Sequence, residues 1–308
     1  MKKIIQIIVF LTAASHLMAQ YEPHYSMNFV FNKLPYNPAY AGSKECTDVV
    51  ALYRKQWAGL SGAPTTINAS FHTPFASNKC GIGLSITNDR IGMLNNSYAQ
   101  LAYAYRMPIG NGVLSAGLQA ELEFAQVDWN KAVVVDPNDP NVQSGMKNSV
   151  KPNFGVGLYY TNPNFFVGLS APRFLKTAYY DNSNVSSGNG QKDKRTYYGM
   201  GGLIIPINKN ILFRPMALVS YNPSAPFEWE INGSLIFARK LWVGASYRSA
   251  DSFDVFLSYD ITKSLRLGAG YDFTTSQLRT VSSGSFEFMV GYLFDCCSKG
   301  QIDHIRFF

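Results

Sequence analysis

Residues 265–273 read Leu-Arg-Leu-Gly-Ala-Gly-Tyr-Asp-Phe, and this stretch decides the fold. Its odd-numbered residues are apolar, whereas its even-numbered residues are charged or glycine. Because side chains alternate between the two faces of a β-strand, the stretch predicts a strand with one apolar and one polar face. Residues 114–124 and 285–294 repeat the alternation. The chain therefore contains several strands of the same two-faced kind.

The composition of the whole chain agrees with strands that face lipid. Of the 308 residues, 46% are hydrophobic, 14% are aromatic and only 15% are charged. Soluble globular proteins contain about 25% charged residues. Beyond residue 20, however, no apolar run approaches the roughly 20 residues that a membrane-spanning helix needs. The combination favours a β-barrel with an apolar outer face and a polar interior.

A repeat of about ten alternating residues followed by a turn continues from residue 47 onward. It predicts an all-β protein, a closed 14-stranded antiparallel transmembrane outer-membrane β-barrel over residues 47–294. An even number of strands places both ends of the barrel on the same side of the membrane. The expected strands are 47–57, 65–74, 80–88, 97–106, 112–124, 152–160, 164–170, 196–205, 211–220, 228–237, 241–248, 253–260, 265–273 and 285–294.

The lengths of the loops predict how the barrel lies in the membrane. The connections after even-numbered strands are short, whereas those after odd-numbered strands include the long loops 125–151 and 171–195. Residues 249–252 are the one short connection that we expect on the long-loop side. Outer-membrane barrels have short periplasmic turns and longer external loops, so both ends of the barrel are expected in the periplasm.

Three segments outside the predicted barrel complete the domain organisation. Residues 1–19 combine a basic start with an apolar stretch and a small residue before the expected cut, which predicts a cleaved signal peptide. Residues 20–46 are rich in aromatic residues, and we expect them to pack at or in the periplasmic end and to narrow any channel. Residues 295–308 form an expected periplasmic tail.

Charged residues fall on the predicted inner face of the strands. Facing lipid they would be costly, whereas inside the barrel they can pair with one another or with water. We interpret them as a hydrated network that fixes the shape of the barrel, and a conduction pathway is the alternative. These residues are Glu121, Glu123, Glu228, Glu230, Asp254, Asp272, Glu287, Arg106, Arg248 and Arg266.

All four cysteines fall at the predicted periplasmic rim, and closure of the barrel places the first and last strands side by side. Cys46 precedes the first strand, whereas Cys296 and Cys297 follow the last one. We expect Cys46 to form a disulfide with one of these two. A zinc site that uses the thiols and His304 is an alternative, although the spacing is not that of a known zinc finger.

Little in the sequence indicates catalysis or nucleic-acid binding. The formal net charge is +7, but no basic helix or aromatic RNA-binding motif accompanies it. The motifs of serine hydrolases, P-loop proteins and zinc proteases are missing. His72 shares a strand face with Ser70, which we interpret as part of a polar inner face, with a barrel hydrolase as the alternative. We expect no catalytic, cofactor-binding or metal site, and no nucleic-acid partner.

Several motifs near the start of the mature chain resemble those of a known family. They are Met27–Asn32, Tyr36–Gly42, Ala51–Trp57, Gly62–Thr66 and His72–Pro74. Together they resemble the PorP/SprF family of outer-membrane proteins of the type IX secretion and gliding apparatus of Bacteroidetes-type bacteria. The final Arg306-Phe307-Phe308 departs from the commoner ending of that family. The residues that carry the resemblance, and that we take as structural, are Asn37, Pro38, Ala39, Tyr40, Gly42, Tyr53, Arg54, Gln56 and Trp57.

The resemblance implies a role in protein export at the outer membrane. It implies a partner or surface anchor for a secreted adhesin with a type B C-terminal sorting domain, and contact with other components such as periplasmic ring proteins. A passive channel for small or hydrophobic solutes is the alternative. For the adhesin we expect contacts in loops 125–151 and 171–195, and mobile, solvated loops without a partner are the alternative. The second loop carries a mixed aromatic and basic set of residues, Tyr179, Tyr180, Lys192, Lys194 and Arg195.

Overall fold

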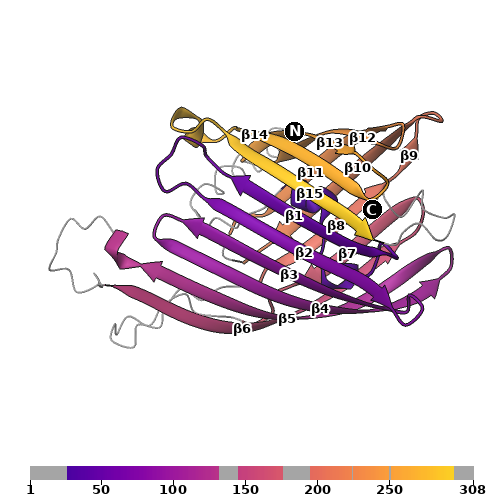
Figure 1. Ribbon diagram of the computed structural model, residues 1–308, viewed down its shortest axis with the longest axis horizontal. Coiled ribbons are helices and arrows are strands. Elements are labelled where there is room, and N and C mark those ends of the chain that lie inside the picture. Colours follow the sequence, from indigo (N-terminus) through magenta and orange to yellow (C-terminus); the bar gives the residue numbers. More distant parts are fainter. Residues whose placement is uncertain (1–25, 132–144, 176–194, 224, 250, 295–308) are drawn as a thin grey trace, which may run out of the picture.

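The computed structural model describes residues 26–131, 145–175, 195–223, 225–249 and 251–294. These residues form a closed barrel of long, tilted strands with two short helical turns inside it (Figure 1). The strands are β1 (Thr47–Lys55), β2 (Thr65–Phe75), β3 (Cys80–Ile91), β4 (Leu94–Ile109), β5 (Gly112–Asp128), β6 (Met146–Thr161), β7 (Phe165–Ala171), β8 (Tyr197–Leu203), β9 (Ile205–Pro206), β10 (Ile211–Tyr221), β11 (Glu228–Phe237), β12 (Leu241–Arg248), β13 (Ser252–Asp260), β14 (Leu265–Thr274) and β15 (Ser285–Phe294). The helical elements are α2 (Ser26–Phe31) and the 3-10 turns η1 (Pro38–Tyr40), η2 (Trp129–Lys131) and η3 (Gln277–Thr280).

The strand pairing closes the sheet upon itself. Consecutive strands pair antiparallel, and β1 pairs with β15 in a register that sets Thr47 opposite Phe294 and Lys55 opposite Phe286. The two-residue β9 pairs with β10, as β8 does, so β8 and β9 act as one barrel strand interrupted at Ile204. The predicted closed barrel of 14 antiparallel strands is confirmed. Among the described residues, no helix is long and apolar enough to cross a bilayer.

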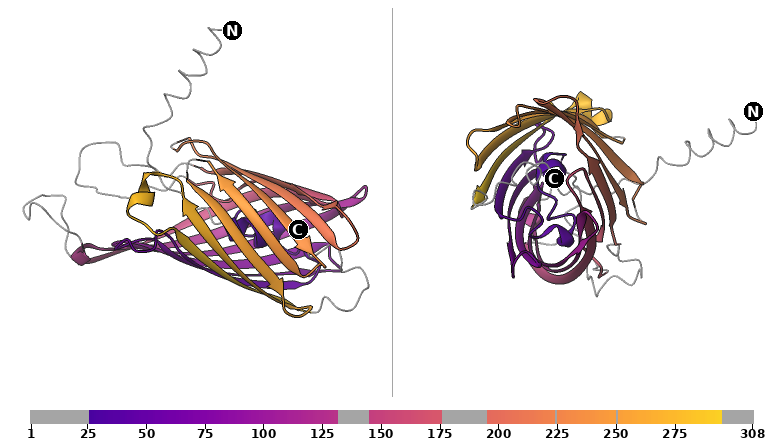
Figure 2. Two further views of the ribbon diagram at one scale, coloured as in Figure 1. Left: turned by 90° about the horizontal axis from the view of Figure 1, so that it is seen from above. Right: turned by 90° about the vertical axis from the view of Figure 1, so that its right-hand side faces the viewer.

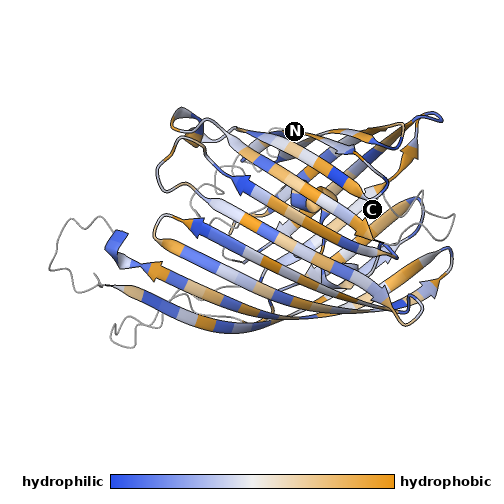
Figure 3. Ribbon diagram, in the orientation of Figure 1, coloured by the Kyte–Doolittle hydropathy of each residue, from blue (hydrophilic) through white to orange (hydrophobic). Residues whose placement is uncertain are grey.

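The side chains alternate between the two faces as the sequence predicts. In β13, Asp254 and Ser258 are buried inside the barrel, whereas Leu257 on the outer face is 53% exposed. Figure 3 shows the same alternation of polar and apolar positions along the neighbouring strands. Apolar side chains exposed on the outer face are unfavourable in water and favourable in lipid. The outer face is therefore the one that the membrane covers.

Four strands, β3 to β6, continue three or more residues beyond the predicted boundaries at the long-loop end. β3 and β4 remain paired up to Ile91 and Leu94, so an expected eight-residue loop is a two-residue turn. Side-chain amides tie this extension together, because Asn88 Nδ2 donates to Asn95 Oδ1 over 2.8 Å. The prediction that residues 249–252 alone are short on this side is therefore wrong. Outside the membrane both faces of a strand can be polar, so no alternation marks the continuation.

The opposite end of the barrel carries only tight turns. The connections 76–79, 110–111, 162–164, 207–210, 238–240 and 261–264 are two to four residues long. β1 begins and β15 ends at this same end. By the general rule for outer-membrane barrels, we expect it to be the periplasmic end. We call it the short-turn end.

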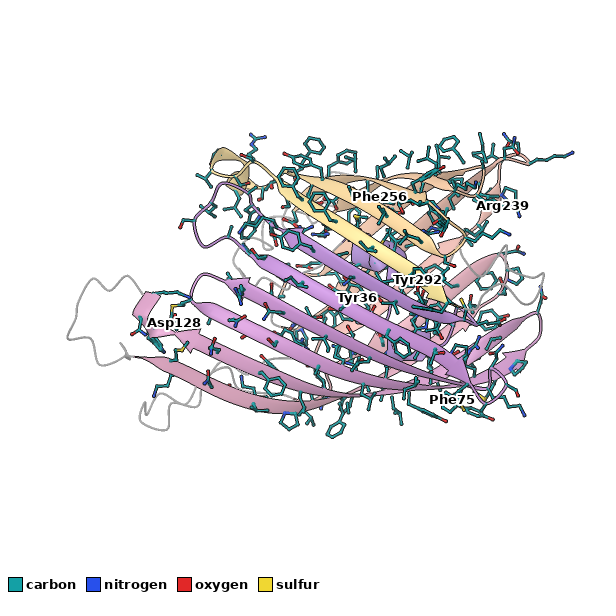
Figure 4. All side chains as sticks on the ribbon, viewed as in Figure 1. Tyr36, Phe75, Asp128, Arg239, Phe256 and Tyr292 are labelled. Atoms are coloured by element: carbon teal, nitrogen blue, oxygen red, sulfur yellow. The ribbon has the colours of Figure 1, made fainter. Side chains whose placement is uncertain are left out.

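Residues 26–46 lie inside the barrel rather than across its mouth, and we call them the plug segment. Figure 2 shows α2 and the following turns enclosed by the strands when the barrel is viewed along its axis. The side chain of Tyr36 is buried within the barrel, whereas Phe75 and Tyr292 lie on its exposed outer face (Figure 4). The hydrophobic core of the molecule is thus formed by the plug segment and the strand residues that face it.

Candidate functional site

The filled lumen is the feature of this barrel on which its function depends. The plug segment is almost entirely buried, and Phe29, Ala39 and Tyr40 have no exposed surface. A barrel of 14 strands is wide enough to hold a polypeptide segment or an aqueous channel. Here a segment of the same chain takes that space.

Aromatic rings attach the plug segment to opposite sides of the barrel. The Phe31 ring packs edge to face on Trp242 of β12, with ring centroids 5.5 Å apart. The Tyr40 ring makes a similar contact with Tyr159 of β6 at 5.5 Å. Such pairs contribute about 0.5–1.5 kcal/mol beyond the burial of their surface. The contacts therefore fix the plug segment at both its helical turns.

Glycines on the inner face let the backbone of the plug segment touch the wall of the barrel. A Cβ added at Gly81 of β3 would lie 2.1 Å from the carbonyl oxygen of Ala41. A Cβ added at Gly117 of β5 would lie 2.2 Å from the backbone nitrogen of Ala39. Real Cβ atoms essentially never approach another atom within 3.0 Å. No residue other than glycine fits these two positions while the plug segment stays in place.

Asn37 connects the plug segment to two strands at once. Its Oδ1 accepts a hydrogen bond from the backbone of Ala39 and so caps η1. Its Nδ2 donates to the carbonyl oxygen of Leu158 over 2.9 Å and lies 3.5 Å from that of Leu169. The neighbouring Gly157 leaves room for this amide, because a Cβ there would lie 2.1 Å from Asn37 Oδ1.

His72 of β2 holds the end of the plug segment. The backbone N–H of Gly42 donates to His72 Nδ1 over 3.2 Å, so the ring proton is on Nε2. That nitrogen faces Asp48 Oδ2 at 3.4 Å, and Asp48 also accepts from Lys44 Nζ over 2.6 Å. Both ring nitrogens of His72 thus take part in contacts that hold the plug segment. The role of this histidine is therefore structural.

Lys33 is a buried cation in the middle of the plug segment. Its Nζ lies 4.8 Å from the centre of the Phe166 ring and 5.4 Å from that of Tyr40. Burial lowers the pKa of Lys33 well below its usual value of 10.5, and the nearby Arg214 guanidinium lowers it further. Keeping these two basic groups among aromatic rings and away from water costs stability.

Carboxylates from neighbouring strands surround Arg54 of β1 beyond the plug segment. The Arg54 guanidinium forms ion pairs with Glu287 of β15 and Asp272 of β14, and all three side chains are buried. Glu287 Oε2 also accepts a hydrogen bond from the backbone N–H of Met27 over 2.9 Å. The ion pairs therefore join the closing strands to the first helical turn of the plug segment.

Two further ion pairs lie on the inner face toward the long-loop end. Arg248 Nε lies 3.5 Å from Glu230 Oε2. Arg173 Nε lies 2.9 Å from Glu121 Oε1, which brings the base of the loop after β7 against β5, two strands away in the sheet. Charges on the inner face are thus paired across strands, as expected for a structural network.

Comparison with known proteins places this architecture in a family. The family described as type IX secretion system membrane protein PorP/SprF matches residues 17–292. The chain belongs to the PorP/SprF family. No curated protein sequence matches it. PorP/SprF membership and the barrel together place the protein in the outer membrane as a component of the type IX secretion system.

Solved structures of other outer-membrane barrels share the fold at low sequence identity. The Ralstonia pickettii toluene transporter TbuX is 12% identical, with 85% of this chain and 92% of that chain covered and a TM-score of 0.52. The Acinetobacter baumannii outer membrane protein Omp33 is 11% identical, with 81% and 98% covered and a TM-score of 0.49. At such identities the likeness concerns the fold alone.

The PorP/SprF motif residues separate into two groups in the structure. Asn37, Pro38, Ala39, Tyr40 and Gly42 lie in the plug segment, with Gly42 in the left-handed region at φ 72°. The second motif lies at the end of β1. There, the Arg54 and Gln56 side chains are buried, whereas Tyr53 is 41% exposed on the outer face and the Trp57 backbone N–H donates to Ser285 Oγ.

The residues expected to contact a partner lie at the loop after β7. Tyr179, Tyr180, Lys192 and Lys194 are outside the described residues. Arg195 is described, and its Nε donates to the carbonyl oxygen of Phe174 over 2.6 Å while the guanidinium covers the Phe174 ring at 4.1 Å. The two ends of this long loop are therefore joined to each other.

Only part of the predicted cysteine chemistry falls on described residues. Cys46 is disulfide-bonded, and Cys80 is a free thiol. Cys296, Cys297 and the alternative zinc ligand His304 lie outside the described residues. Within the described part of the chain, no group of three or more His, Cys, Asp or Glu side chains could hold a metal ion.

Reasoning from the sequence missed the residues that receive the plug segment. The sequence places three glycines, Gly81, Gly117 and Gly157, on the polar faces of strands. A glycine at such a position does not indicate which part of the chain packs against it. The buried Lys33 and Arg214 were missed as well. Arg214 shares the inner-face register with Met216 and Leu218, so alternation along β10 could have placed it in the lumen.

Proposed function

We propose that this PorP/SprF barrel is the outer-membrane partner or surface anchor of a secreted adhesin with a type B C-terminal sorting domain. The adhesin is held at the external end, and periplasmic components of the apparatus contact the short-turn end. The barrel itself carries out no reaction in this proposal. Family membership supports a place in type IX secretion, and the structure of the lumen supports docking over free conduction.

The filled lumen is the observation that carries the proposal. A passive channel needs a continuous aqueous path, whereas the plug segment is buried against strands on opposite sides of the barrel. Its attachment by hydrogen bonds, ring contacts and ion pairs makes displacement costly. A rigid, filled cylinder suits a protein that presents fixed loops to a partner.

The base of the loop after β7 supports its use as the docking element. The contacts of Arg195 with Phe174, and of Arg173 with Glu121, hold both ends of this loop against the barrel. A loop with anchored ends loses less conformational freedom when a partner binds it. The tyrosines within the loop are of a residue type that commonly dominates protein interfaces.

Replacement of residues 176–194 by a Gly/Ser linker of equal length tests the proposal. We expect surface display of the adhesin, measured by antibody labelling of whole cells, to fall by an order of magnitude or more, while the barrel remains in the outer membrane. The matched control replaces 277–280 in another long external loop by the same kind of linker, with display unchanged. Normal display and co-purification of the adhesin with the first variant would contradict the proposal.

Single-channel recording separates docking from the alternative of a passive channel. The purified wild-type barrel in a planar bilayer should show little conductance because the plug segment occupies the lumen. A steady, large conductance of the wild-type protein would favour the channel. The likeness to a toluene transporter and to porins does not decide this point, since it concerns the fold alone.

A further inference from the structure

A cavity opens at the short-turn end, between the last residues of the plug segment and the turns after β4 and β6. Its volume is about 240 Å³, just below the range of about 300–1,000 Å³ typical of small-molecule sites. Its wall includes Ser43 and Glu45 of the plug segment, Arg106 of β4, Asn111 of the next turn and Tyr159 of β6. Most of these side chains are polar, so the cavity suits a polar or charged ligand.

Among the described residues that line this cavity, Arg106 is the one cation, and it is almost completely buried. Its Nη1 donates to the carbonyl oxygen of Asn78 over 3.1 Å, which fixes the guanidinium against the neighbouring turn. Its Nε makes no hydrogen bond within the described residues. A buried donor without an acceptor costs about 1–3 kcal/mol, so this edge of Arg106 favours a ligand that can accept.

Glu45 is the nearest carboxylate to this edge of Arg106, but its contact is long. Its Oε1 lies 3.5 Å from Arg106 Nη2, beyond the usual length of a charge-assisted hydrogen bond. The Glu45 side chain is 39% exposed, and its backbone is in the left-handed region at φ 55°. An exposed side chain at this distance can turn into solvent and leave the guanidinium to another anion.

The Nε and Nη2 groups of an arginine form an edge that a carboxylate matches with two parallel hydrogen bonds. In Arg106 this edge carries the Nε without a partner among the described residues and the Nη2 with its long contact to Glu45. The remaining nitrogen, Nη1, donates to the carbonyl oxygen of Asn78. Ser43, Asn111, Tyr159 and Asn162 also line the cavity. These groups suit the polar backbone of a short peptide that ends in, or carries, a carboxylate.

We propose that this cavity is a binding site for a carboxylate-bearing ligand from the periplasm, in which Arg106 binds the carboxylate and Glu45 is displaced. The ligand is the carboxylate of a polypeptide or a small free carboxylate. This deepens the proposed function, on which it rests for the periplasmic location of the cavity, because it gives the short-turn end a place to hold a periplasmic partner.

Ligand-observed NMR titration of the full mature protein in detergent micelles tests the site. The probes are acetyl-Gly-Ser-Ala with a free C-terminal carboxylate, the same peptide as its C-terminal amide, and sodium acetate. We expect the acid peptide to bind saturably and the amide to bind about 10-fold more weakly or worse, since a lost charge-assisted pair corresponds to roughly that factor. Acetate that competes as well as the acid peptide identifies a small carboxylate as the ligand, whereas a clear advantage of the peptide identifies a polypeptide.

Two variants and a matched control connect binding to the named residues. Arg106→Gln should weaken binding of the acid peptide about 10-fold, and Glu45→Gln should tighten it because the competing carboxylate is gone. Lys209→Gln removes one positive charge from an exposed turn at the same end but outside the cavity, and should change nothing. If Arg106→Gln does not fold, Glu45→Gln decides the question, and unchanged affinity overturns the site.

Equal binding of acid and amide peptides, or wild-type affinity in a folded Arg106→Gln protein, also overturns the site. Neither result touches the docking of the adhesin at the external end, which is measured by surface display in cells. Conversely, normal display after replacement of 176–194 overturns that docking role and leaves the NMR result unaffected. The two proposals therefore fail separately.

Discussion

Gly117→Ala should loosen the plug segment, although it adds only one methyl group. The new Cβ would lie 2.2 Å from the nitrogen of Ala39, and 2.5 Å from both the Ala39 Cα and the carbonyl carbon of Pro38. Ordinary van der Waals contact begins at 3.4 Å, so the closest pair overlaps by 3.4 − 2.2 = 1.2 Å. All three neighbours are backbone atoms, so a side-chain rotation cannot relieve the overlap.

The size of the effect depends on how the overlap is relieved. Overpacking of a core by one methyl group costs typically about 1–3 kcal/mol. Movement of the plug segment away from β5 instead would lengthen the hydrogen bond from Asn37 to Leu158, at a similar cost. We therefore expect the free energy of unfolding to fall by about 2 kcal/mol, which corresponds to a decrease in Tm on the order of 5 °C.

Thermal unfolding in detergent and protease protection of residues 26–46 measure the two consequences. Gly291→Ala is the matched control, because it lies on the inner face of β15 and its nearest neighbour would be Arg266 Cβ at an ordinary 3.7 Å. The control should keep the wild-type Tm and protection. If Gly117→Ala also keeps both, the plug segment does not rest on β5 as described, and the reasoning is refuted.

Three other predictions follow from buried charges and the seam. Arg54→Gln should lower the free energy of unfolding by about 3–5 kcal/mol, because it leaves the buried Asp272 and Glu287 without their cation, and denaturant titration of the variant measures this. The pKa of Lys33 is lowered in the folded state, so the unfolded state binds more protons between that lowered pKa and 10.5. The free energy of unfolding of wild type should therefore rise relative to that of Lys33→Met as the pH increases from 8 to 10. Parallel stability curves for the two proteins would contradict this. Peptide mapping without reductant should find Cys46 joined to a cysteine of the C-terminal segment, whereas a link to any other peptide would refute the predicted pairing.

The sequence predicts the barrel well because lipid imposes a strict pattern on every strand that crosses it. A residue on the outer face of β13 or β14 must be apolar, so alternation marks each strand almost to its ends. The pattern stops where lipid stops. The extension of β3 and β4 up to Ile91 and Leu94 was missed for that reason, because polar residues such as Asn88 and Asn95 can lie on either face of a strand in water.

The interior is harder to predict because its requirements come from residues far apart in the chain. The aromatic content of residues 20–46 indicates a packed segment, but nothing local shows that Ala39 rests on Gly117 or that Asn37 bonds to β6. A glycine on the polar face of a strand indicates only that another part of the molecule packs closely against that position. The partner can be identified only once closure of the barrel has brought residues 37 and 157 together.

The contacts that hold the plug segment lie at different depths in the barrel. The Arg54 ion pairs hold its start toward the long-loop end, whereas the ring contacts of Phe31 and the contacts of His72 and Gly81 lie toward the short turns. A partner at the short-turn end that displaces Glu45 acts three residues from Gly42, where the segment is bonded to His72. Binding there therefore bears first on the contacts of Gly42 with His72 and of Lys44 with Asp48, while the buried Arg54 ion pairs continue to hold the start of the segment. Such a barrel can receive a periplasmic ligand and still keep its external loops in place, which is what a docking component between two compartments requires.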